Sequence, residues 1–405
     1  MPETRIPANS HARLGAVAGD LRVGAGGRIE ADGKVAVSGE ARFDGPAEIV
    51  GTLECTRLRA GEGSVRVSGD LLVGEEIDSR DGSIDVGGSL KARRVDVART
   101  LHVAGSSEAH KFDVGGRLEG GGPLRAEAVS VGGQLQVAGP LTARSVEAGG
   151  SMDVGEITIE SLDVGGSVRV GRGEVRRTIS VGGRFLATGE LTFGSLDVGG
   201  FAEFKEAARG GAIVVGGMLA AERDLTFDSL EIGGFGRIGG SGKGGRVEVG
   251  GHFDVRGSFD LEGPLEVGGA ITVGGALTGE RLEVGGKIAA RRAVFRDAVR
   301  LAGIIGTEEG LKGARVRIER RSRARGPIVG GAVEIGRGAH VEDVYGERVE
   351  LHEKAEAQRI FGAVVELRER ASAVEVVFTG SVEISPGATV RVGPKKVDTL
   401  PAFPL

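Results

Sequence analysis

Apolar and polar residues alternate along this chain in short stretches that recur about every 17 residues. The clearest marker of the repeat is an aliphatic residue followed by two glycines, as at Val181 and again at Val198. Two positions before each marker stands another apolar residue, so the two share one face of a strand. The markers are Val114, Val131, Ala148, Val164, Val181, Val198, Val215, Ile232, Val249, Val267 and Val284. So regular a period predicts one structural unit stacked on copies of itself.

Two further apolar pairs complete each repeat. One follows the glycines, as at Val168 and Val170, and a less regular one comes later, as at Leu191 and Phe193. The residue between two apolar positions is usually polar, as at Asp163, and is expected to face solvent. Three short strands in about 17 residues predict one turn of a three-sided coil, with the paired glycines at a corner. The predicted fold is therefore all-β, a triangular parallel β-helix (solenoid) with room for about 22 turns.

The spacing of the repeats divides the chain into five segments. The main β-helix is expected over 19–302, and repeats with a different spelling are expected over 327–393. Between them, 303–326 is expected to be a break or an Arg-rich segment. Residues 1–18 and 394–405 are predicted to be a flexible N-terminal tail and a C-terminal tail.

Composition excludes several classes of protein. The chain has 75 glycines but no G-X-Y rule, so it is not collagen. With no Trp and one Tyr it lacks the aromatic faces on which sugar-binding and base-stacking sites depend. Cys55 is the single cysteine, and no apolar run is long enough to span a membrane. We expect a cytoplasmic protein, with association to a membrane surface left open.

The repeat texture resembles that of the bactofilins, the polymer-forming cytoskeletal proteins. The resemblance is carried by phrases such as SLDVGGSVRV from Ser161 and LEVGGKI from Leu282, and it covers most of the chain. It implies a right-handed β-helix that polymerises end to end without nucleotide, as a scaffold that is often placed at a membrane. This chain is several times longer than a compact member of that family and shows no apolar targeting segment at its N-terminus.

Two other functions are alternatives to a scaffold. A left-handed hexapeptide-type acyltransferase fits the phrase VGGSLK from Val86 loosely, but it needs a catalytic His, and the histidines occur without a repeated setting. An adhesin-like binding solenoid needs an export signal, and we expect none in this sequence. The glycines at 240–244 depart from the phosphate-loop pattern, because Gly244 stands where Ser or Thr is required. We therefore predict a protein that is not an enzyme, with no catalytic, cofactor-binding or metal-binding residue.

Candidate binding surfaces remain at the ends of the coil and in the Arg-rich segment. The ends of a solenoid expose strand edges that can pair with another strand. We therefore expect a homo-oligomer or filament. The polymer-end contacts are predicted at Leu21, Val23, Val382, Ile384, Val390 and Val392. A patch for an anionic partner, whether a membrane surface, a nucleic acid or an acidic protein, is predicted at Arg315, Arg317, Arg320, Arg321, Arg323 and Arg325.

Overall fold

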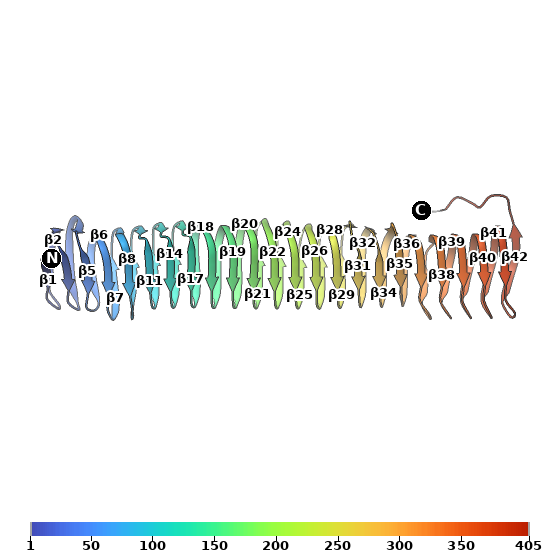
Figure 1. Ribbon diagram of the computed structural model, residues 1–405, viewed down its shortest axis with the longest axis horizontal. Helices are drawn as coiled ribbons and strands as arrows, with labels where there is room; N and C mark the ends of the chain where they lie inside the picture. The colour runs from blue at the N-terminus through green and yellow to red at the C-terminus, as the bar shows by residue number, and fades with distance from the viewer. Residues whose placement is uncertain (1, 404–405) are drawn as a thin grey trace. The chain divides into compact units, whose positions relative to one another are not determined.

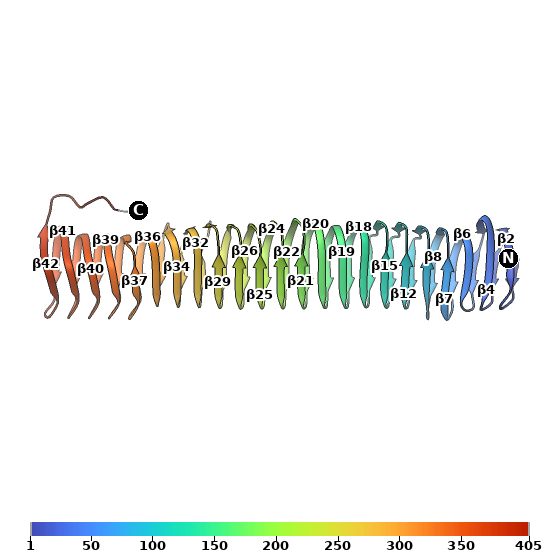
Figure 2. The ribbon, with the colours of Figure 1, turned by 180° about the vertical axis from the view of Figure 1, so that it is seen from behind.

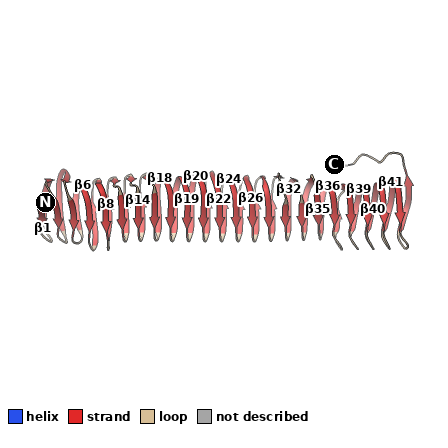
Figure 3. Ribbon diagram, in the orientation of Figure 1, coloured by secondary structure: helices blue, strands red, loops and turns tan. Residues whose placement is uncertain are grey.

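The structure, a computed structural model, describes residues 2–403. The fold is a parallel β-solenoid of about 23 turns, with successive turns roughly 17 residues apart. Within the described residues every regular element is a strand, as Figure 3 shows. The chain divides into two compact units, Met1–Gly199 and Gly200–Leu405, and each is described by itself.

The first unit holds the strands up to β22. Their bounds are β1 (Glu3–Ile6), β2 (His11–Val17), β3 (Asp20–Val23), β4 (Gly27–Val37), β5 (Glu40–Phe43), β6 (Ala47–Ala60), β7 (Gly63–Val67), β8 (Leu71–Ser79), β9 (Gly82–Val86), β10 (Leu90–Lys91), β11 (Arg94–Val97), β12 (Thr100–Val103), β13 (Ser107–Glu108), β14 (Lys111–Val114), β15 (Arg117–Gly120), β16 (Leu124–Arg125), β17 (Ala128–Val131), β18 (Gln134–Ala148), β19 (Ser151–Val164), β20 (Ser167–Val181), β21 (Arg184–Ala187) and β22 (Leu191–Val198).

The second unit holds the remaining strands. Their bounds are β23 (Phe201–Phe204), β24 (Ala208–Val215), β25 (Met218–Ala221), β26 (Leu225–Ile232), β27 (Phe235–Ile238), β28 (Gly242–Val249), β29 (His252–Val255), β30 (Phe259–Leu261), β31 (Leu265–Val267), β32 (Ala270–Gly279), β33 (Leu282–Val284), β34 (Lys287–Phe295), β35 (Ala298–Leu301), β36 (Ile304–Ile318), β37 (Arg323–Arg325), β38 (Ile328–Ile335), β39 (His340–Leu351), β40 (Glu356–Leu367), β41 (Ser372–Ile384) and β42 (Thr389–Lys396).

Each turn contributes to three parallel ladders. In the first unit, β14 pairs with β17, while β15 and β16 both pair with the longer β18. Figure 1 shows how strands of successive turns lie side by side. The inward residues, such as Phe112, Leu118 and Leu124, are fully buried, whereas the polar residues between them are outside. The three-stranded turn with apolar residues inside, predicted from the sequence, is confirmed.

The paired glycines occupy the corners, but for a reason the sequence did not supply. Gly115, Gly132 and Gly149 have ordinary negative φ values and are stacked directly above one another. A Cβ atom on Gly132 would lie 2.2 Å from the carbonyl oxygen of Gly115. Glycine is therefore required because the neighbouring turn comes so close, and not because the backbone is left-handed.

Three segment boundaries differ from those expected. Residues 2–18 are not a tail, because β1 and β2 pair with β3 and β4, and the apolar Ile6 and Val17 are buried. Residues 303–326 contain no break, because β36 pairs with strands on both sides while Val316 and Ile318 face inward. The C-terminal strand β42 also extends to Lys396, inside the segment expected to be a tail.

The chain after β42 turns back over its own unit, as both Figure 1 and Figure 2 show. It brings the ring of Phe403 to 5.7 Å from the ring of Tyr345. Tyr345 in turn stacks on Phe361 of the next turn, with 4.8 Å between ring centres. Phe361 alternates with inward residues, so it faces outward, yet only 9% of it is exposed. The C-terminal segment thus lies against an outward apolar stripe.

Candidate functional site

At the N-terminal end of the first unit, the predicted contact residues lie one turn inside. Leu21 and Val23 are fully buried, because β1 pairs over them with Thr4 against Leu21 and Ile6 against Val23. This corrects the sequence-based assignment, which took the first residues for a tail. The end turn is instead made of β1 and β2. On their outer side neither strand has a partner strand within the described residues.

At the C-terminal end of the second unit, the predicted residues do lie on the last turn. Ile384 is 41% exposed and Val392 is 57% exposed, while Val382 and Val390 are half-buried. Val382, Ile384 and Val390 are aligned with buried residues of the preceding turn, whereas Val392 is aligned with the partly exposed Glu375. Val382 and Ile384 pair with the preceding turn, and β42 pairs with β41, but no strand of residues 2–403 covers their other side. This end presents both open backbone edges and apolar side chains.

A column of charged side chains runs up the outside of the ladder that contains β1. We call it the outer charge column, and it consists of the residue between the two inward residues of each strand in that ladder. At the N-terminal end of the first unit its members are Arg5, Arg22, Arg42 and Arg59. At the C-terminal end of the second unit its members are Glu334, Glu350, Glu366 and Glu383. The two end turns therefore carry opposite charges at equivalent positions.

The basic end of the column is held by acids on neighbouring positions. Arg5 pairs with Glu3 on its own strand at 2.5 Å, and 69% of the Arg5 side chain is exposed. Arg22 donates to Asp44 at 2.7 Å, and this hydrogen bond lowers the pKa of Asp44 below its usual value. Both arginines are thus charged; Arg5 is largely exposed and Arg22 is half-buried.

At the acidic end of the column, only some of the glutamates are held by ion pairs. Glu366 accepts hydrogen bonds from Arg348 at 2.7 Å and from Arg368 at 2.8 Å, and the bond from Arg348 lowers the pKa of Glu366. Glu383, the last member of the column, makes no ion pair with any described residue. The column is hidden in the sequence because the spacing of the early turns is uneven: Arg5 and Arg22 are 17 residues apart, whereas Arg22 and Arg42 are 20 residues apart.

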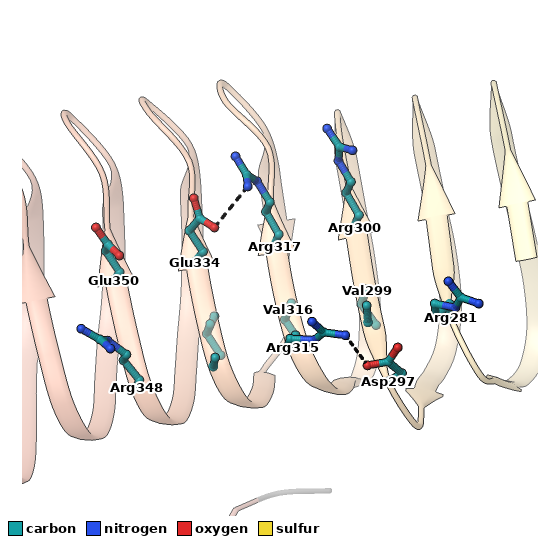
Figure 4. A pocket seen from close by; sticks show the side chains of 13 residues that line it. Arg281, Asp297, Val299, Arg300, Arg315, Val316, Arg317, Glu334, Arg348 and Glu350 are labelled. Atoms are coloured by element: carbon teal, nitrogen blue, oxygen red, sulfur yellow. Dashed lines mark hydrogen bonds and ion pairs between the residues drawn. The ribbon is translucent and has the colours of Figure 1, made fainter. Parts of the chain in front are cut away.

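The Arg-rich segment does not form one patch. Arg315 and Arg317 lie on β36 beside a groove of about 850 Å³, where Arg315 pairs with Asp297 at 2.7 Å and Arg317 pairs with Glu334 at 3.4 Å. Figure 4 shows both pairs along with Arg281, Arg300 and Arg348. These acids offset much of the positive charge of the groove.

The other four arginines lie elsewhere. Arg320 and Arg321 are in the corner after β36, and Arg323 and Arg325 are on β37, which belongs to another ladder. All four are exposed, and none makes an ion pair with a described residue. The structure thus separates two paired arginines from four unpaired ones.

Residue types capable of catalysis are dispersed. Cys55 is buried, and this burial raises the pKa of its thiol to about 12, so the thiolate is not formed at neutral pH. Several histidines contact acids in separate places, such as His102 with Glu119 at 3.2 Å and His352 with Glu334 at 2.9 Å. Within residues 2–403 no group of three or more His, Cys, Asp or Glu side chains is placed to hold a metal ion.

Comparisons with known proteins returned no family model, no curated protein and no solved structure that matches this chain. Among the described residues there is also no helix that is long and apolar enough to cross a membrane.

Proposed function

We propose that this protein is a non-enzymatic structural scaffold that self-associates end to end. The observation that carries the proposal is the open last turn, where Ile384 is exposed and Val390 is half-buried although their counterparts in the preceding turn, Leu367 and Ala373, are buried. Strand edges of this kind accept another strand unless a cap covers them. Association would bury these apolar side chains and pair the open edge, as each turn does for the next.

The resemblance to bactofilins belongs to this proposal. It supports a cytoskeletal polymer in the cytoplasm that forms without nucleotide, because a solenoid grows by stacking and needs no bound cofactor to do so. The contacts between copies would then repeat those already made between turns. No catalytic role is needed for that function.

Light scattering and negative-stain electron microscopy of the full-length protein over a range of concentrations test the proposal. We expect particle mass to rise with concentration and elongated assemblies to appear. The double variant Ile384→Lys, Val390→Lys should weaken association, because it places charges at inward positions of the contact. Ile304→Lys is the matched control, since Ile304 is 58% exposed but lies within the second unit, away from the last turn. A wild-type protein that stays monomeric at high concentration would overturn the proposal.

A second role, binding of an anionic partner, is supported by the four exposed and unpaired arginines from Arg320 to Arg325. Lysine and arginine side chains that are not already paired release counterions when they meet phosphates, which favours binding at low salt. Replacing all four with glutamine should reduce sedimentation with vesicles that contain anionic lipid. Replacing the ion-paired Arg315 and Arg317 is the matched comparison and should have less effect.

A further inference from the structure

We infer that the copies associate head to tail, with the last turn of the second unit of one copy against the first turn of the first unit of the next. This inference rests on the proposed self-association and adds its polarity and register. The partner surface is thus a second copy of this chain. The observations that carry it are the parallel ladders, the matching edge strands and the opposite charges of the outer charge column.

The two edges match in length and pattern. The end of β41, residues 381–384, follows the register of the preceding turn, with Glu383 aligned to Glu366 and Ile384 aligned to Leu367. Strand β1 opens the first ladder with Arg5 aligned to Arg22 and Ile6 to Val23. Continuing the ladder across the junction places Val382 beside Thr4, Glu383 beside Arg5 and Ile384 beside Ile6. Apolar or small residues then meet on the inner face.

Charge favours this register. Over the several turns nearest each end, the members of the column all carry the same charge. Like charges on neighbouring strands, about 4.8 Å apart, repel each other. In the head-to-tail register, the row of glutamates at the end of one copy meets the row of arginines at the start of the next, so the charges across the junction attract. Glu383, which lacks an ion-pair partner within the described residues, receives Arg5 of the next copy.

Contacts between like ends fit less well. Every strand pairing between turns in the two units is parallel, and a head-to-tail junction preserves this. A two-fold axis between like ends would place the edge strands antiparallel. A tail-to-tail contact would also bring the glutamates of two columns together, including Glu366 and Glu383 of each copy. Such a contact would have to overcome repulsion that the head-to-tail contact avoids.

Charge reversal at the two end positions tests the inference. We expect Arg5→Glu and Glu383→Arg each to raise the concentration needed for assembly by at least roughly fivefold at low salt, because each turns an attraction into a repulsion. Mixing the two variants should restore assembly, since every junction between unlike variants then pairs an acid with a base. The double variant should also assemble by itself.

Asp163→Arg is the matched control, because Asp163 occupies the same column within the first unit and makes no ion pair with a described residue. It should leave the assembly concentration unchanged, and circular dichroism should show that all variants are folded. Assembly that is insensitive to Arg5→Glu and Glu383→Arg would overturn the inference. So would a mixture that assembles no better than the separate variants. In both cases wild-type assembly would leave the proposed function standing, whereas a strictly monomeric wild type would remove both.

Discussion

At the scale of single residues, the corners of this solenoid use two kinds of special position. Corners of the Val-Gly-Gly repeats need glycine because turns are stacked closely, as at Gly132. Corners of the last turns instead have a left-handed residue, with φ values of 57° at Arg321, 64° at Gly338 and 56° at Arg370. Only the second kind depends on conformational freedom. Adding a Cβ atom at a stacked glycine should therefore lower stability, whereas removing the side chain of a left-handed arginine should raise it.

Gly132→Ala should destabilise the fold by about 1–3 kcal/mol, because its Cβ would overlap the backbone of the preceding turn and force the turns apart. Chemical unfolding monitored by circular dichroism measures the loss. Gly155→Ala is the control, since the nearest atom to a Cβ there is the carbonyl oxygen of Ala138 at 3.5 Å. Equal stability losses in the two variants would contradict the stacking explanation.

Arg370→Gly should stabilise the fold by about 0.5–1 kcal/mol. The left-handed conformation costs a non-glycine residue about 1–2 kcal/mol, and the greater chain entropy of glycine in the unfolded state removes only part of that gain. Arg144→Gly on strand β18, where φ is ordinary, should instead lower stability. Thermal unfolding of the two variants side by side distinguishes the effects, and a destabilised Arg370→Gly would count against this explanation.

At the scale of elements, the sequence predicted the repeating strands well and the exceptions poorly. The inward pairs of each turn are local, so the sequence specifies them directly. Strand β1 is hard to recognise in the sequence because no Gly-Gly corner follows Ile6, although Ile6 and Val23 are one period apart. A break or Arg-rich segment is expected over 303–326 because the aliphatic-Gly-Gly marker is missing between Val284 and Val329, whereas β36 keeps Val316 and Ile318 inward without it.

The candidate contacts were predictable to a smaller extent. The strand of the last turn could be located because the apolar alternation of Val365 and Leu367 recurs one period later at Val382 and Ile384. The outer charge column depends on register between turns of unequal length. Neither the position of Arg22 opposite Arg42 nor the separation of Arg317 from Arg323 onto different ladders can be read from spacing alone.

The C-terminal segment should act as a cover for the outward apolar stripe. Phe403 contacts Tyr345, and Tyr345 stacks on Phe361. Phe403→Ser should therefore lower stability by about 1 kcal/mol and increase binding of a hydrophobic dye. The comparison is Phe201→Ser, which alters an outward aromatic residue on β23, away from the stripe. Dye binding unchanged by Phe403→Ser would show that the segment does not protect the stripe.

At the scale of the whole molecule, the charges that matter most lie at the first and last turns. Arg22 with Asp44 and Arg348 with Glu366 fix the columns next to the two open edges. Both carboxyl groups have lowered pKa values, and in both cases the hydrogen bond from arginine is the main cause. The arginine of each pair is open to solvent, which screens the attraction, so each pair contributes modestly; both pairs lie near the ends where copies would meet.

Acid should therefore weaken the folded turns near the two ends before it weakens the interior of either unit. A carboxyl group whose pKa is lowered by folding stabilises the native state above its unfolded value, which is near 3.8 for Asp44 and 4.5 for Glu366. That contribution is lost as pH falls through the lower, folded value. Hydrogen exchange measured from pH 6 down to about pH 3 should show protection lost first in β3, β5, β39 and β40, the strands that carry or adjoin these pairs. Asp44→Asn should remove the pH dependence near β3 only, and uniform loss of protection along both units would contradict the assignment to these pairs.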